Sequence, residues 1–180
     1  MQKLLLTILL ISIGYTNSNA QNVKIGVKAG LNYANFTGSE IQTDAITSYH
    51  AGIIAEISIL DSFSIQPELL YSTQGASYEN AIDEYKNELG YISLPVLLKI
   101  YLSDSFSLDV GPQASFLLNK KDEFNLNDYN TFDFSANAGL SLKITKSLFA
   151  QARYSLGLTE VSKNADVKNS VVQVSLGVLF

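Results

Sequence analysis

The sequence has little that could support redox, thiol or metal chemistry. Its 180 residues include no cysteine, no tryptophan, one methionine and one histidine, His50. Without cysteine the chain can form neither disulfides nor thiolate sites. Zinc-ligand spacing and glycine-rich phosphate-binding loops are also missing from it. We therefore expect no cofactor, no bound metal and no cysteine-based catalysis.

Basic residues are also scarce. The chain has 12 lysines and arginines against 17 aspartates and glutamates, and no run of basic residues. Proteins that bind nucleic acid usually carry a basic patch that neutralises phosphates. The charge balance therefore argues against a nucleic-acid partner.

Long apolar runs are missing after residue 20, so the sequence contains no segment that could span a membrane as a helix. The first 20 residues form a different pattern: Lys3, a short apolar stretch, then small residues with Ser18 and Ala20 spaced as signal peptidase requires. This predicts a signal peptide at 1–20, cut between Ala20 and Gln21, and one exported domain at 21–180. The apolar stretch is too short for a membrane anchor.

Apolar and polar residues alternate strictly in eight segments of the remaining chain. In the last of them Val172, Val174, Leu176, Val178 and Phe180 form one wholly apolar face. A period of two is the pattern of a β-strand with two different faces. The eight predicted strands are 24–33, 49–59, 63–74, 91–102, 106–118, 132–143, 148–158 and 169–180.

The connections between these strands alternate in length. Tight turns are expected around 61–62, 103–105 and 145–147, and long polar loops at 34–48, 75–88, 119–131 and 159–170. Outer-membrane barrels have short periplasmic turns, long extracellular loops and an even number of strands. The fold class predicted is all-β, an eight-stranded antiparallel up-and-down transmembrane β-barrel. Both termini would be periplasmic, and the long loops extracellular.

A soluble barrel with an apolar interior is the alternative, and the charged residues argue against it. All charged strand residues share one face: Lys24, Lys28, Glu56, Glu68, Lys99, Asp109, Asp133, Lys143 and Arg153. The opposite face is aliphatic with aromatic residues near the strand ends: Phe63, Phe106 and Phe180 toward the short turns, and Tyr33, Tyr49, Tyr71, Phe116, Phe132 and Phe134 toward the long loops. An aliphatic band between two aromatic girdles is typical of a lipid-facing surface.

Three prolines do not fit this pattern easily. Pro67, Pro95 and Pro112 all lie inside predicted strands, where each lacks the N–H that a neighbouring strand would accept. A closed barrel has no free edge to place them on. β-Bulges could absorb them, but the sequence alone does not explain three such prolines.

The segments that contain the prolines also resemble a known family. "SIQPELLYSTQGA" (64–76), "YISLPVLLKIYL" (91–102) and "LDVGPQASFLL" (108–118), together with "KIGVKAGLNYANFTG" (24–38), resemble the conserved blocks of the PorT-like outer-membrane β-barrel family of Bacteroidetes. The resemblance extends over essentially all of 21–180. It implies an outer-membrane barrel and brings no catalytic signature. A role in secretion and gliding, as in the family's named member, does not follow from it. The terminal Phe180 resembles the signal that the barrel-assembly machinery reads.

The charges on the inward face could form a selective pore or a paired network that fills the lumen. Five are basic and four acidic, which favours pairing, and an eight-stranded barrel encloses only enough space for side chains. The sequence therefore predicts a filled lumen and a structural or interaction protein. A minor porin-like channel is the alternative.

His50, with Ser48 two residues before it, raises a third possibility, an outer-membrane lipid-modifying enzyme. Histidine, a nucleophile and a carboxylate would have to lie within hydrogen-bond reach. We expect instead that His50 forms hydrogen bonds in the lumen and that the protein is not an enzyme. The oxygen-rich segment 122–133 could hold Ca²⁺ but lacks the order of an EF-hand, so a solvated loop is expected.

The long loops are acidic, with about twice as many acidic residues as lysines. Loops on a rigid scaffold commonly carry recognition, so a loop-binding partner is plausible. No feature of the sequence identifies that partner.

Overall fold

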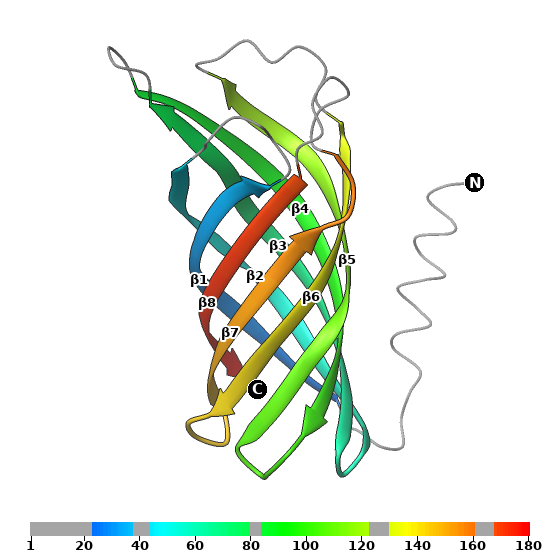
Figure 1. Ribbon diagram of the computed structural model, residues 1–180. Helices are drawn as coiled ribbons and strands as arrows, with labels where there is room; N and C mark the ends of the chain where they lie inside the picture. Colours follow the sequence, from blue (N-terminus) through cyan, green and yellow to red (C-terminus); the bar gives the residue numbers. More distant parts are fainter. Residues whose placement is uncertain (1–22, 38–43, 80–83, 123–129, 161–167) are drawn as a thin grey trace, which may run out of the picture.

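The computed structural model describes residues 23–37, 44–79, 84–122, 130–160 and 168–180. The predicted signal peptide lies outside the described residues. Eight antiparallel strands in the described part close into one barrel, and each strand pairs with its neighbours in the sequence (Figure 1). No helix of the described part is long and apolar enough to cross a membrane.

The strands follow the predicted order: β1 (Val23–Thr37), β2 (Asp44–Leu60), β3 (Phe63–Glu79), β4 (Glu84–Tyr101), β5 (Phe106–Asp122), β6 (Phe132–Lys143), β7 (Leu148–Gly157) and β8 (Lys168–Leu179). The first and last strands close the barrel, with registered pairs from Gly26 and Leu179 to Thr37 and Lys168. Beyond β8, the Phe180 N–H donates to Ile25 O at 2.8 Å. The start of β1 and the end of β8 therefore both lie at the rim of the barrel that carries the short turns. The predicted eight-stranded up-and-down barrel is confirmed.

The bounds predicted on the long-loop side were wrong for β1 to β5, because these strands continue past the apolar alternation, whereas those of β6 to β8 agree to within one residue. β3 and β4 remain paired out to Glu79 and Glu84, within the segment predicted as a loop at 75–88. Parts of 34–48 and 119–131 are likewise strand. Backbone pairing needs no apolar face once a hairpin rises above the bilayer, so periodicity does not mark where it ends. Figure 1 shows β3, β4 and β5 rising above the rest of the rim.

The two faces of the strands have opposite environments, as predicted. β6 alternates between exposed and buried positions along most of its length. Outward side chains are apolar and exposed, including Leu31, Ile53 and Val174. Inward side chains are mostly polar and buried, and they include Lys28, Glu68 and Arg153. Four of the aromatic residues expected near the loop-side rim form two contacting pairs: Tyr49 with Tyr71, and Phe116 with Phe132.

The prolines are accommodated by gaps in the strand ladders and not by β-bulges. Each proline lies at an interruption in its pairing with the preceding strand, and the ladder resumes in the same register: Pro67 toward β2, Pro95 toward β3 and Pro112 toward β4. The register shifts that do occur lie elsewhere in these ladders. A proline has an extended φ compatible with a strand and lacks only its donor, so losing bonds on one side suffices.

Ala138 on β6 tests which face meets lipid. It points outward near mid-strand, and Ile144 follows on the same face, at the start of the short turn. Arginine at the bilayer midplane costs about 2–4 kcal/mol, but only about 0–1 kcal/mol near the interface. We expect Ala138→Arg to lower the free energy of unfolding by the larger amount and Ile144→Arg by the smaller. Urea titration in lipid vesicles measures both, and equal losses would contradict the assigned facing.

Candidate functional site in the barrel lumen

Glu68 of β3 is the centre of the buried lumen network. Its Oε2 accepts from Lys28 Nζ of β1 at 2.8 Å and from Arg153 Nη1 of β7 at 3.0 Å, and its Oε1 accepts from Gln66 at 2.7 Å. The Glu68 side chain and both cationic side chains are almost fully buried. Burying charges is costly unless they are paired and hydrogen-bonded, so each of these charges needs its partner. Because the partners come from β1, β3 and β7, the contacts also join strands on opposite walls of the barrel.

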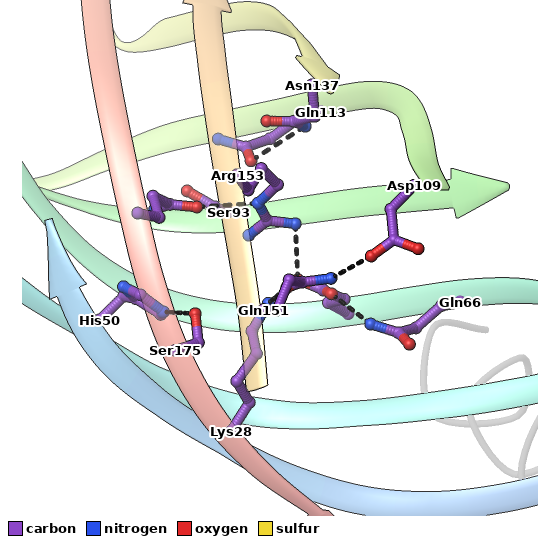
Figure 2. A network of polar contacts seen from close by, with 12 residues as sticks. Lys28, His50, Gln66, Ser93, Asp109, Gln113, Asn137, Gln151, Arg153 and Ser175 are labelled. Atoms are coloured by element: carbon purple, nitrogen blue, oxygen red, sulfur yellow. Dashed lines mark hydrogen bonds and ion pairs between the residues drawn. The ribbon is translucent and has the colours of Figure 1, made fainter. Parts of the chain in front are cut away.

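Gln151 of β7 links this centre to a second carboxylate. Its Oε1 accepts from Lys28 at 2.9 Å, and its Nε2 donates to Asp109 Oδ2 at 2.7 Å. Figure 2 shows these side chains pointing toward one another across the lumen. Asp109 also accepts from the hydroxyls of Ser107 and Ser141. Neutral amides and hydroxyls therefore satisfy a carboxylate that was expected to pair with a base.

A second ion pair lies closer to the short turns. Lys99 Nζ of β4 lies 2.9 Å from Glu56 Oε2 of β2 and donates to Gln66 Oε1 at 3.0 Å. The same ammonium lies 5.4 Å from the centre of the Phe149 ring, within the range of a cation–π contact. Gln66 thus connects the two ion-pair groups into one continuous network.

His50 of β2 joins the network through Asn32 and Ser175, and not through Ser48. The Asn32 amide nitrogen donates to Thr73 O at 2.7 Å, which leaves Asn32 Oδ1 facing His50 Nδ1 at 2.7 Å. Since that oxygen only accepts, His50 carries its proton on Nδ1, and Nε2 accepts from the Ser175 hydroxyl at 2.8 Å. The Ser48 hydroxyl donates to Thr73 O at 2.6 Å instead.

The Ser175–His50–Asn32 chain has the hydrogen-bond order of a nucleophile, a base and an orienting group. All three residues are nevertheless buried: 3% of Ser175, 1% of His50 and none of Asn32 is exposed. A Cβ at Gly30 of β1 would collide with Val174 O and lie 2.8 Å from His50 Cε1, so the glycine lets the imidazole pack tightly. The arrangement supports the expected hydrogen-bonding role of His50 in the lumen.

Two clusters of apolar side chains are buried in the lumen beside the polar network. Toward the long loops, Leu89 and Tyr91 of β4 pack with Phe36 and Leu117. Ile54, Phe149 and Leu179 form a second buried cluster, in which Ile54 is directly opposite Glu68 in the ladder and the Phe149 ring lies against Lys99. An aqueous pathway would have to pass these apolar clusters and the ion pairs beside them. The lumen is therefore built as a filled core.

Some buried polar atoms on β6 to β8 have no hydrogen-bond partner in the part of the chain that the structure describes. They include Ser135 Oγ, Asn137 Oδ1 and Arg153 Nη2. Buried polar groups are rarely left unpaired in proteins, and ordered water is their usual partner. We expect bound water along this wall.

The residues that the sequence analysis singled out lie in different surroundings in the structure. Most of the inward charges are buried in the lumen as expected, but Lys24 is exposed at the short-turn mouth and Lys143 is only partly buried. Asp133 contacts the Thr159 hydroxyl at 2.9 Å. Most of the candidate Ca²⁺ segment 122–133 lies outside the described residues. No cluster of possible metal ligands occurs among the residues that are described.

The sequence interpretation missed the neutral members of the network. Gln66, Gln151, Gln173 and Asn32 connect the ionic groups, with Gln173 Nε2 donating to Asn32 Oδ1 at 2.9 Å and its Oε1 accepting from Arg153 Nε at 2.9 Å. The alternation along the sequence already places these residues on the inward face of the strands. Which of them meet across the lumen depends on the stagger between strands, and the alternation does not contain that information.

Comparisons with known proteins agree with this architecture. The family model described as "Outer membrane protein beta-barrel domain" matches residues 19–163. The fold is similar to crystal structures of Neisserial surface protein A (TM-score 0.62, 16% identity, 87% of this chain and 97% of that one) and of Ail from Yersinia pestis (0.56, 11%, 88% and 99%). It is also similar to OprG from Pseudomonas aeruginosa (0.51, 9%, 88% and 96%). No curated protein matches the sequence significantly.

Proposed function

Because the chain belongs to the family of outer membrane protein β-barrel domains, we propose that it is a small integral outer-membrane protein with a structural or loop-mediated interaction role. The filled lumen is the observation that carries this proposal. Lys28 and Arg153 are both paired with Glu68 at the centre, and apolar clusters are buried beside this network. Such a barrel offers no path for solutes, so its function falls to its outer surface, its mouths and its loops.

The orientation in the membrane is part of the proposal. The start of β1 and the end of β8 both lie on the short-turn rim. In bacterial barrels the short turns face the periplasm. The long loops would then be extracellular. The match of the family model from residue 19 is compatible with a mature chain at 21–180 after removal of a signal peptide. Phe180, exposed beyond β8, remains the candidate signal for barrel assembly.

The extracellular partner would be neutral or basic. Ail has been crystallised with the heparin analogue sucrose octasulfate, a polyanion. The long segments of the present chain are acidic, so charge repulsion disfavours a polyanion on this rim. Membership of the PorT-like family of Bacteroidetes remains a proposal based on the sequence blocks around Pro67, Pro95 and Pro112.

A minor channel is the second candidate, and a lipid-modifying enzyme based on His50 the third. The unpaired polar atoms on β6 to β8 favour some hydration of the lumen, which a channel needs. The apolar clusters argue against conduction. The burial of His50 and Ser175 argues against catalysis on a lipid.

Planar-bilayer recording separates the first two candidates. The purified protein should show no stable conductance steps. The double variant Tyr91→Ala/Phe149→Ala, which shortens one aromatic side chain in each apolar cluster, should show more frequent current fluctuations because both clusters then fill less of the lumen. Stable, reproducible steps from the wild-type protein would overturn the closed lumen and promote the channel.

A further inference from the structure

A buried carboxylate without a cationic partner lies at the long-loop end of the lumen. Asp133 is the second residue of β6, points inward and is only 3% exposed. Its Oδ1 accepts from the Thr159 hydroxyl at 2.9 Å. In the part of the chain that the structure describes, no lysine or arginine is paired with it. A buried charge is costly without a counter-charge, so this carboxylate is expected to attract one.

Gly157 of β7 leaves the inward face beside this carboxylate without one side chain. It is directly opposite Ser135 in the ladder between β6 and β7. A Cβ built on it would lie 2.8 Å from Asn169 O of β8, so the glycine lets the two strands approach closely. Ser135 and Asn169 therefore flank a position that carries no side chain. Asp133 is two residues before Ser135 on the same face of β6.

The polar side chains on either side of Gly157 have unused hydrogen-bonding atoms. Ser135 Oγ and both amide atoms of Asn169 have no partner among the described residues. The two residues are almost fully buried, at 1% and 3% exposed. Asn169 lies beside the Asp133 carboxylate, but without the geometry of a hydrogen bond. Its amide can therefore turn its oxygen toward a ligand without breaking a contact to the described residues.

Oxygen is the ligand atom that these side chains share, and hard cations prefer oxygen. The set carries one negative charge, and no group of three acidic or histidine side chains that could hold a metal ion occurs in the described part of the chain. Water alone would satisfy the neutral atoms but leave the charge of Asp133 uncompensated. We propose that Asp133, Ser135 and Asn169 bind one monovalent hard cation, Na⁺ or K⁺. Asp133 is its charged ligand, and water completes the coordination.

The position of the site gives the cation a structural effect at the long-loop rim. Asp133 follows the first residue of β6, and Thr159, just beyond β7, is partly exposed, so the site is close to the outer mouth of the lumen. A cation shared by Asp133 and Asn169 holds β6 and β8 together across β7. It thereby fixes the base of the long connections that follow β5 and β7.

Amide chemical shifts of the full-length protein, refolded in nonionic detergent, test the proposal. NaCl replaces choline chloride at constant ionic strength and neutral pH, and KCl does so in a second titration. We expect saturable shifts at Asp133, Ser135, Gly157 and Asn169, and the ion that saturates at the lower concentration is the preferred one. Saturation by neither ion overturns the proposal. A carboxyl ¹³C shift that shows Asp133 to be protonated at neutral pH does so as well, because a proton then neutralises the charge.

Substitutions at the site provide the matched comparison. Asp133→Asn should weaken binding at least about ten-fold, the equivalent of one charge-assisted contact. Asp104→Asn, which removes an exposed carboxylate in the turn after β4, should leave the affinity unchanged. Asn169→Asp adds a second carboxylate and should raise the affinity for Ca²⁺ relative to Na⁺. Gel mobility without heating confirms that each variant is a folded barrel. Full affinity in Asp133→Asn, an equal loss in Asp104→Asn, or no gain for Ca²⁺ in Asn169→Asp would place the cation elsewhere and overturn the proposal.

Discussion

Replacing Glu68 by glutamine is expected to lower the free energy of unfolding of the barrel by about 3–5 kcal/mol, the usual cost of removing one partner from a buried ion pair. Glu68 is the carboxylate that accepts from both Lys28 and Arg153, and both cationic side chains are almost fully buried. Glutamine keeps the size of the side chain but leaves two buried positive charges without a counter-ion. Reversible urea unfolding in lipid vesicles measures the loss.

Two further variants distinguish this cause from a general sensitivity of the lumen. Asp133→Asn also neutralises a buried carboxylate, but one held by the Thr159 hydroxyl, so we expect a loss of only about 1 kcal/mol. The triple variant Glu68→Leu/Lys28→Met/Arg153→Met removes the whole charged group, and it should recover most of the stability that Glu68→Gln loses. A Glu68→Gln barrel within about 1 kcal/mol of the wild type would contradict the assigned importance of the ion pairs.

The sequence was sufficient to predict the fold because apolar and polar residues alternate with a period of two in the predicted strands. Alternation in 132–143 and 169–180 gives the facing of each residue, and an even number of such segments allows closure. The placement of Glu68 and Arg153 in the lumen followed directly from this parity. The strand ends did not, because pairing continues to Glu79 and Glu84 where neither face is required to be apolar.

The details of the lumen depended on how the strands are staggered. Lys28 meets Glu68 and Gln151, which lie on the third and seventh strands, and no local pattern records that meeting. Ser48 is close to His50 in sequence and on the same face, yet the hydroxyl that reaches His50 comes from Ser175 on the last strand. The strand tilt and stagger that closure requires set these contacts.

The same closure predicts that deleting residues 171–180 prevents barrel formation. The deletion removes most of β8, which pairs with both β1 and β7. Their freed N–H and C=O groups would face hydrocarbon, where each unsatisfied group costs several kcal/mol. We expect the truncated chain to be absent from the folded outer-membrane fraction and to show no heat-modifiable band on gels.

Deleting Phe180 alone is the matched control. It removes a side chain that is 79% exposed and one hydrogen bond, from its N–H to Ile25 O, and leaves the registered pairs of β8 intact. Any barrel that forms should be within about 1 kcal/mol of the wild type, the usual net value of one hydrogen bond. If Phe180 is also the assembly signal, this variant should reach the outer membrane more slowly without being less stable.

A cysteine pair reports on closure directly, because the chain has no cysteine of its own. Leu31 and Val174 are directly opposite each other on β1 and β8, and both face outward. Residues opposed in this way have Cβ atoms close enough for a disulfide to form. Leu31→Cys/Val174→Cys should therefore cross-link on oxidation in the full-length protein. A truncated chain without 171–180 that still inserted as a closed barrel would show that β8 is not the strand that completes it.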